Sequence, residues 1–237
     1  MTTVGLLLPE GTPEDDYRRI ETLLGGDIRV DSVAYGEPGP GGASGGGEAA
    51  PLTAEGERLR LAGADAVVWA AAGASFAPGW DAALEQARTL AVAAGVPASS
   101  TAIGFARALR ELGVAKVAVA GGYPRDVLEE VARFLAAAGV EVVGSGGGSA
   151  AMSLPELVRA ADGPLAQAVL VPDTATPCVA EVAAAEAAVG KPVLTGTQVT
   201  VWEGLRLAER RGAWADELGA LFARRGPAAA HAAEPAG

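Results

Sequence analysis

The chain has 237 residues, half of them hydrophobic, with 33 glycines and a formal net charge of −11. An acidic chain of this kind argues against binding to nucleic acid or to an anionic membrane surface, because both need a basic patch. A single cysteine excludes an internal disulfide and a cysteine-rich metal site, and we predict no metal ligands. The first residues lack the basic segment of a signal peptide and no stretch is apolar enough to span a bilayer, so we expect a cytoplasmic protein.

Strands and helices are predicted to alternate along the first half. The first strand, residues 4–8, ends at Pro9, and a helix over 12–24 has Thr12 as its N-cap and Pro13 at its first position. The glycine- and proline-rich segment 36–51 can bury little apolar surface, and we expect a mobile linker there. The other predicted elements of this half are strands at 27–35, 64–70 and 96–100, helices at 52–63, 79–95 and 101–113, and a loop of small residues at 71–76.

The second half repeats this series. It has a strand and turn at 115–126, strands at 140–144, 166–172 and 191–197, and helices at 127–139, 153–162, 178–190 and 199–212. Three pairs of stretches correspond in order: 4–12 with 117–126, 64–74 with 166–176, and 94–113 with 189–209. Strands that alternate with helices predict parallel βαβ units. We therefore expect an α/β fold of two pseudo-symmetric, doubly wound parallel-sheet lobes, with residues 1–113 plus 205–225 in the first lobe, 114–204 in the second, and a flexible tail at 226–237.

Open parallel sheets bind ligands beyond the carboxyl ends of their strands. Two such lobes that face each other predict an inter-lobe cleft lined by Pro9–Thr12, Ala70–Ser75, Gly121–Pro124, Asp173–Thr176 and Thr195–Gln198. The single histidine, His231, lies in the tail and is a poor candidate for a base or a metal ligand.

Four stretches carry a resemblance to a known group of enzymes: VGLLLPEGT, ADAVVWAAAGASF, STAIGFARALRELGVAKVAVAGGYPRDV and AVGKPVLTGTQVTVWEGLRLA. In their order and spacing they resemble the aspartate/glutamate racemase superfamily, in the branch of maleate cis-trans isomerase and arylmalonate decarboxylase. The likeness covers roughly residues 3 to 210. It implies two pseudo-symmetric lobes with the site between them, and proton transfer without a cofactor at a carbon next to a carboxylate. Two cysteines, one in each lobe, usually do this work in the family.

The sequence departs from the family pattern at both cysteines. The first would fall near Ala71, the second falls on Asp173, and Thr12 replaces an asparagine after the first strand. Tyr123 is retained, and the resemblance implies that it helps to hold a substrate carboxylate. With Asp173 and Tyr123 as the catalytic residues, we expect substrate contacts from Pro9, Thr12, Ala71, Ala72, Gly73, Ser75, Thr174 and Gln198.

Cys178 is the only thiol that could replace the missing ones. Thr176 and Pro177 predict an N-cap and a first helical position, which would place Cys178 in the first turn, where a thiol can have a lowered pKa. Cys178 lies five residues beyond the family position, however, and small cysteines are commonly packing residues. We favour packing. Asp173 itself has three interpretations: a helix-capping group, a general base, or a ligand for a cationic or hydroxyl group.

Charge limits the reaction. An ionised Asp173 would repel a carboxylate placed against it, so either Asp173 is protonated or the substrate has one anionic end and a neutral or cationic end. Our leading hypothesis is an enzyme without cofactor that performs isomerisation, proton transfer or decarboxylation alpha to the carboxylate of a small carboxylic acid. The alternatives are a catalytically silent relative that binds a small metabolite, and an Asp-dependent hydrolase or lyase. The oligomeric state stays open, with a homo-oligomer as one expectation.

Overall fold

The computed structural model describes residues 1–36, 49–148, 152–174, 176–210 and 212–223. Most of the predicted linker 36–51 and the predicted tail 226–237, with His231, lie outside these residues. Over the described ranges the strands form two four-stranded parallel sheets. The strands are β1 (Thr2–Pro9), β2 (Ile28–Tyr35), β3 (Ala66–Trp69), β4 (Ala98–Ser100), β5 (Lys116–Ala120), β6 (Glu141–Gly146), β7 (Ala168–Val171) and β8 (Val193–Thr195).

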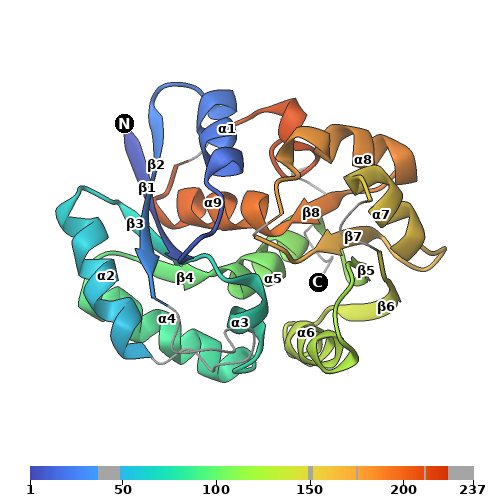
Figure 1. Ribbon diagram of the computed structural model, residues 1–237, viewed down its shortest axis with the longest axis horizontal. Coiled ribbons are helices and arrows are strands. Elements are labelled where there is room, and N and C mark those ends of the chain that lie inside the picture. The colour runs from blue at the N-terminus through green and yellow to red at the C-terminus, as the bar shows by residue number, and fades with distance from the viewer. Residues whose placement is uncertain (37–48, 149–151, 175, 211, 224–237) are drawn as a thin grey trace, which may run out of the picture.

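Helices cover the faces of both sheets (Figure 1). Several end where the sequence predicts, because Gly95, Gly113 and Gly190 take the left-handed conformation that closes a helix. The helices are α1 (Asp15–Leu24), α2 (Ala49–Leu61), α3 (Ala72–Phe76), α4 (Trp80–Ala94), α5 (Thr101–Leu112), α6 (Arg125–Ala137), α7 (Leu154–Ala161), α8 (Val182–Val189) and α9 (Gly196–Leu207), with the 3-10 turns η1 (Val179–Glu181) and η2 (Asp216–Leu218).

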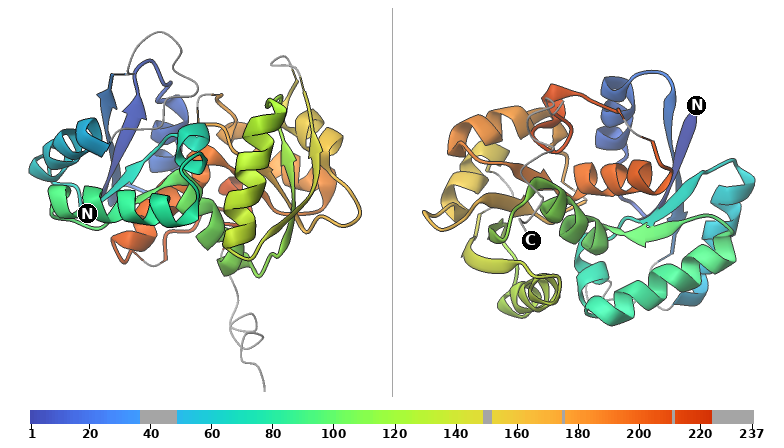
Figure 2. Two further views of the ribbon diagram at one scale, coloured as in Figure 1. Left: turned by 90° about the horizontal axis from the view of Figure 1, so that it is seen from below. Right: turned by 180° about the vertical axis from the view of Figure 1, so that it is seen from behind.

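The two sheets have the same topology. Their strand orders are β2-β1-β3-β4 and β6-β5-β7-β8, and each pairing is parallel. The strands β1, β3 and β4 thus hold the same places as β5, β7 and β8, which are the three correspondences predicted from the sequence. Figure 2 shows the two sheets side by side, each with its own helices. The predicted fold of two α/β lobes is confirmed.

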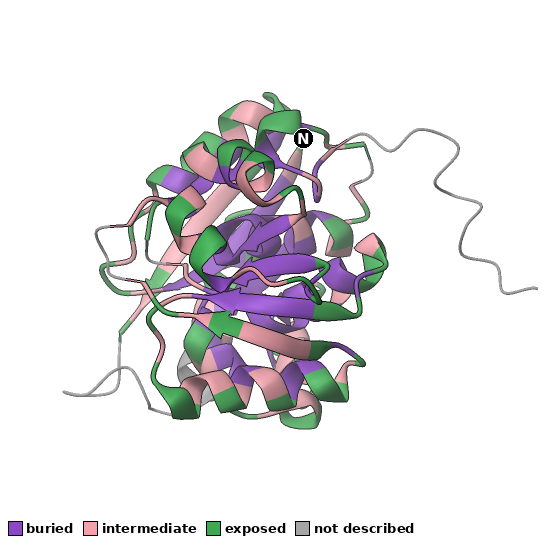
Figure 3. Cartoon of the chain, turned by 90° about the vertical axis from the view of Figure 1, so that its right-hand side faces the viewer, coloured by how far each residue is buried: buried purple, intermediate pink, exposed green. Residues whose placement is uncertain are grey.

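A continuous apolar core joins the lobes. The same cluster of buried side chains contains Leu6 and Val68 of the first sheet and Val119 and Leu170 of the second. In Figure 3 most strands are buried and the helices around them present exposed outer faces, while the edge strands β2 and β6 are mostly of intermediate burial. The tightly packed strands explain how a chain with few aromatic residues still fills its interior.

Helix α9 follows the last strand of the second sheet but packs against the first sheet and α5. Gly204 of α9 lies so close to Val4 of β1 that a Cβ atom would collide with the valine. Glu203, fully buried, pairs with Arg107 of α5 and, at 2.7 Å, with Arg206. The predicted division between residues 204 and 205 therefore falls within a helix that contacts the first sheet; the lobe boundaries themselves stay a prediction.

Two local predictions are wrong. Thr12 is not the N-cap of α1: its amide donates to the Pro9 carbonyl at 3.1 Å in a turn, and the helix begins only at Asp15, after Glu14. Residues 72–76, predicted as a loop, form the short helix α3. Within the part of the chain that the structure describes, no helix has the length and apolarity needed to cross a membrane.

Candidate functional site

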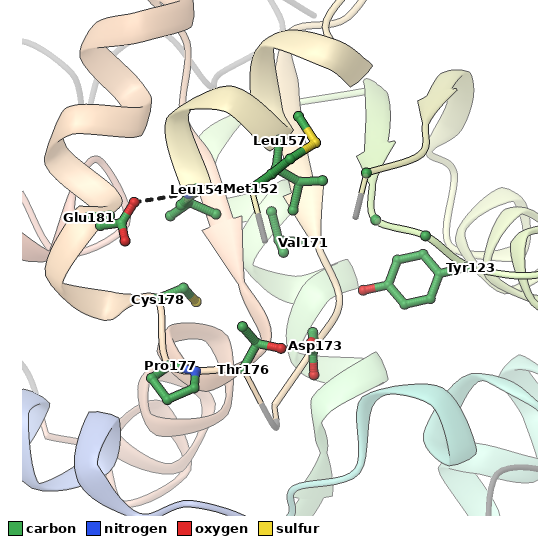
Figure 4. A pocket seen from close by; sticks show the side chains of 13 residues that line it. Tyr123, Met152, Leu154, Leu157, Val171, Asp173, Thr176, Pro177, Cys178 and Glu181 are labelled. Atoms are coloured by element: carbon green, nitrogen blue, oxygen red, sulfur yellow. Dashed lines mark hydrogen bonds between the residues drawn. The ribbon is translucent and has the colours of Figure 1, made fainter. Parts of the chain in front are cut away.

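A cavity of about 350 Å³ opens at the carboxyl ends of β5 and β7 (Figure 4). The start of α7 and the turn before η1 close its other sides. Its position agrees with the rule that parallel sheets bind ligands beyond the ends of their strands. The residues that line it are Gly121, Gly122, Tyr123, Gly148, Met152, Leu154, Leu157, Val171, Asp173, Thr176, Pro177, Cys178 and Glu181.

Tyr123 enters the cavity from the loop after β5. Gly121 makes this possible: its φ of 149° is disfavoured for other residues, and the Tyr123 ring lies where a Cβ atom would be. Burial raises the pKa of the Tyr123 hydroxyl, and the charge of Asp173 raises it further. The hydroxyl therefore stays protonated at neutral pH, and Figure 4 shows it pointing into the cavity. It is a hydrogen-bond donor for an anionic ligand group.

Asp173 follows β7 by two residues. Its amide donates to the Val171 carbonyl at 2.8 Å, and its carboxylate accepts the Thr176 hydroxyl at 2.6 Å, which orients the side chain. The backbone of Asp173 lies directly against Gly196, the first residue of α9, where a side chain would collide with the Asp173 carbonyl. A glycine at 196 thus allows the start of α9 to support the turn that carries the carboxylate.

Cys178 faces the cavity but is not an activated nucleophile. The predicted N-cap at Thr176 is wrong: the 3-10 turn η1 begins at Val179 and α8 begins at Val182. Burial, and after it the charge of Asp16, raises the pKa of the thiol to about 12. At neutral pH the sulfur is therefore protonated, and it packs in the apolar cluster of the second lobe.

Asp16 holds the turn that contains Cys178. Its buried carboxylate accepts the amide of Cys178 at 2.7 Å and that of Val179 at 3.0 Å. Because Asp16 lies on α1, this contact ties the first lobe to the cavity wall of the second. Beside it, the hydroxyl of Tyr17 is buried and makes no hydrogen bond of standard geometry within the described residues, and the Thr197 side chain lies near it.

The cavity is lined by apolar side chains and two carboxylates. Its apolar side chains are Met152, Leu154, Leu157, Val171 and Pro177, and its carboxylates are those of Asp173 and Glu181. None of its described lining residues is Lys, Arg or His. Clusters of three or more His, Cys, Asp or Glu that could hold a metal ion are likewise absent from the described ranges.

The structure brings Asp173 and Tyr123 together in this cavity, and the described lining residues all come from 121–181. The other predicted contact residues lie outside the lining. The Thr174 hydroxyl donates to the Ala70 carbonyl at 3.5 Å, which brings the ends of β7 and β3 together, and Pro9 and Thr12 lie at the end of β1. Ala71 precedes α3, and Ala72, Gly73 and Ser75 belong to it.

Ser75 and Gln198 are occupied by structural hydrogen bonds. The Ser75 hydroxyl donates to the Ala72 carbonyl and accepts the Ala102 amide, each at 3.1 Å. The buried Gln198 side chain accepts the Thr195 amide at 2.9 Å and donates to the Leu218 carbonyl, which joins α9 to the η2 turn. A role for either in substrate binding stays a prediction.

Sequence reasoning missed Asp16, Tyr17 and Glu181. The two acids occur in or near first helical turns, where an acid is ordinarily explained by the helix dipole. The contact between Asp16 and Cys178 spans 162 residues. Of the three, only Glu181 could have been suspected from the sequence, because it follows the predicted catalytic turn closely in the chain.

Comparisons with known proteins agree with this fold. A family model described as arylmalonate decarboxylase matches residues 50–222. Among solved structures, arylmalonate decarboxylase is 25% identical with a TM-score of 0.78, covering 93% of this chain and 98% of that chain. The maleate isomerase Iso from Pseudomonas putida is 18% identical with a TM-score of 0.77, covering 94% and 98%.

A mutant of the Nocardia farcinica maleate cis-trans isomerase, with a covalently bound succinylcysteine intermediate, is 18% identical with a TM-score of 0.73, covering 92% and 98%. The two isomerases are similar in fold. No curated protein matches the chain in sequence. Because the family model spans well over half of its residues, the chain belongs to the arylmalonate decarboxylase family.

Proposed function

We propose that this protein is an enzyme without cofactor that moves a proton at the carbon next to the carboxylate of a small organic acid, with Asp173 as its acid/base group. The observation that carries the proposal is the position of the Asp173 carboxylate, which lies beside the Tyr123 hydroxyl just after the carboxyl end of β7. The resemblance places the second family cysteine at this position. Membership of the arylmalonate decarboxylase family supports the class of reaction.

The two side chains divide the work. Asp173 accepts the proton from the alpha carbon, and the electron pair of the C–H bond moves into the carboxylate to give an enediolate. Tyr123, which stays protonated, donates a hydrogen bond to the oxygen on which negative charge develops. Asp173 exchanges this proton with solvent and returns one to the same face of the carbon, which completes proton exchange at the alpha carbon. Thr176 keeps the Asp173 side chain oriented through its 2.6 Å hydrogen bond.

Three substrates separate the reaction types. In heavy water, 2-phenylpropanoate reports proton exchange at the alpha carbon, phenylmalonate reports decarboxylation, and maleate reports isomerisation, all by NMR. We expect exchange with 2-phenylpropanoate. General acid–base catalysis contributes about 100- to 10,000-fold, so Asp173→Asn should lower the rate by at least about 100-fold. Asp126→Asn, a change at an exposed acid on α6, serves as the matched control.

A gain-of-function variant also tests the role of position 173. Asp173→Cys supplies a thiol where the resemblance implies the family thiol, and we expect it to add decarboxylation of phenylmalonate at concentrations high enough to offset weak binding of a diacid. An Asp173→Asn variant that exchanges 2-phenylpropanoate at the wild-type rate would exclude Asp173 as the base. Binding of these acids without exchange in any of them would favour the catalytically silent alternative, for which the protonated state of Cys178 is a supporting observation.

A further inference from the structure

The cavity has two carboxylates on different sides. Figure 4 shows Asp173 near Tyr123, and Glu181 on the far side, beyond Cys178 and next to Leu154. Glu181 accepts the Leu154 amide at 2.9 Å, so its carboxylate is fixed at the start of α7. The positive end of a helix dipole stabilises a negative charge there. Glu181 is therefore held in place by this contact with α7, and it also lines the cavity.

The hydrogen-bond donors of the lining side chains are few. The Tyr123 hydroxyl points into the cavity, whereas the Thr176 hydroxyl already donates to Asp173. The Cys178 thiol is a weak donor. With no Lys, Arg or His in the described lining, these side chains supply donors for one carboxylate of a ligand and leave a second one without a partner.

The rest of the wall is suited to an apolar group. Leu154, Leu157, Val171 and Met152 lie between the two acids and face the same space. The volume of about 350 Å³ is at the lower end for small-molecule sites, which fits an acid with one ring or a branched chain. A ligand whose carboxylate meets Tyr123 would direct its substituent along this wall, toward Glu181.

Resting on the proposed function, we infer that the cavity selects acids with a single carboxylate and an uncharged apolar substituent, and that Glu181 excludes a second carboxylate. A second negative charge would meet Glu181 in a partly enclosed space, where repulsion is stronger than in water. Rejection of the wrong ligand by a like charge is a common way to obtain specificity. Glu181 is a specificity residue in this account, and it takes no part in the proton transfer.

The chain offers a matched pair of variants. Glu156 also caps α7, accepting the Ser153 amide at 2.9 Å, but it is exposed and outside the cavity. Glu181→Gln and Glu156→Gln therefore remove one charge each from the same helix end, and a glutamine oxygen can still accept the capped amide. Thermal melting of both variants checks that the fold is kept.

Calorimetric titration with phenylacetate and phenylmalonate at pH 8 measures the selectivity without any need for turnover. We expect the wild-type protein to bind phenylacetate at least about tenfold more tightly, a difference of about 1.4 kcal/mol. Glu181→Gln should reduce this ratio by about tenfold through tighter binding of phenylmalonate, and Glu156→Gln should leave it unchanged. Higher ionic strength should also reduce the wild-type ratio.

The outcomes are distinct. Equal affinity of the wild type for both acids, or binding of neither, overturns the inference, and so does a ratio that Glu181→Gln leaves intact. An equal effect of Glu156→Gln would assign the selectivity to the overall charge of the protein and overturn the role of Glu181. If the expected ratios are found but no acid is turned over, the proposed reaction fails while the selectivity stands.

Discussion

The contact between Asp16 and the turn at Cys178 predicts a large effect on stability. Asp16→Ala removes a buried carboxylate that accepts two backbone amides, at 2.7 and 3.0 Å. Hydrogen bonds to a charged group contribute about 1.5–3 kcal/mol each, and the amides would be left buried without a partner. We therefore expect a loss of about 3–5 kcal/mol in the free energy of unfolding. For a chain of this size, that lowers Tm by roughly 10 °C.

Urea and thermal unfolding followed by circular dichroism measure this loss. Asp15→Ala is the matched control, because Asp15 belongs to the same first turn of α1 and is exposed. It should change the free energy of unfolding by less than about 0.5 kcal/mol. Asp16→Asn keeps an acceptor oxygen without the charge and should fall between the two. A Tm for Asp16→Ala equal to that of the Asp15 control would refute the view that this contact joins the lobes.

Three further predictions concern the cavity and its surroundings. Tyr17→Phe removes a buried hydroxyl that makes no hydrogen bond of standard geometry, so the free energy of unfolding from urea titration should be unchanged or higher by up to about 1 kcal/mol. A clear loss would show that the hydroxyl is paired, with the nearby Thr197 side chain as its partner. Gly121→Ala should displace Tyr123 and abolish binding of phenylacetate. The control is Gly139→Ala, at a residue with a φ of 84° and open space around it. It should lower the free energy of unfolding by the backbone strain alone, about 1 kcal/mol, and the variant should bind phenylacetate normally. Burial raises the pKa of Cys178 to about 12, so iodoacetamide at pH 8 should modify the folded protein at least about 100-fold more slowly than the urea-unfolded one. Comparable rates would contradict the burial of the thiol.

Local patterns predicted the strands and most helices because their causes are local. Short runs of Val, Leu and Ala, as in β3 and β7, are buried on both faces of a parallel sheet, and Gly95 and Gly113 end their helices through their own conformation. The error at Cys178 arose because a tertiary contact decides the local structure there. The turn at Cys178 stays out of α8 because Asp16 takes up the amides of Cys178 and Val179.

The candidate site likewise has one part that the sequence predicts and one part that it does not. That Asp173 and Tyr123 lie close together could be predicted because each follows a strand, and strand ends meet at one edge of a sheet. Their catalytic roles come from the family resemblance and stay a proposal. The wall formed by Leu154 and Leu157 could not, since an amphipathic helix shows which face is apolar but not what covers it. Glu181 was missed for a related reason: its partner is the amide of Leu154, 27 residues earlier in the chain.

The crossing of α9 also bears on how the protein is made. Val4 and the rest of β1 leave the ribosome long before the helix that packs against them through Gly204. The first lobe therefore cannot complete its core until α9 has been synthesised and must wait with part of its apolar surface uncovered. Contacts this distant in sequence slow folding and favour populated intermediates. We expect a truncation before α9 to yield a chain that requires chaperones or aggregates, although every residue of the cavity is still present.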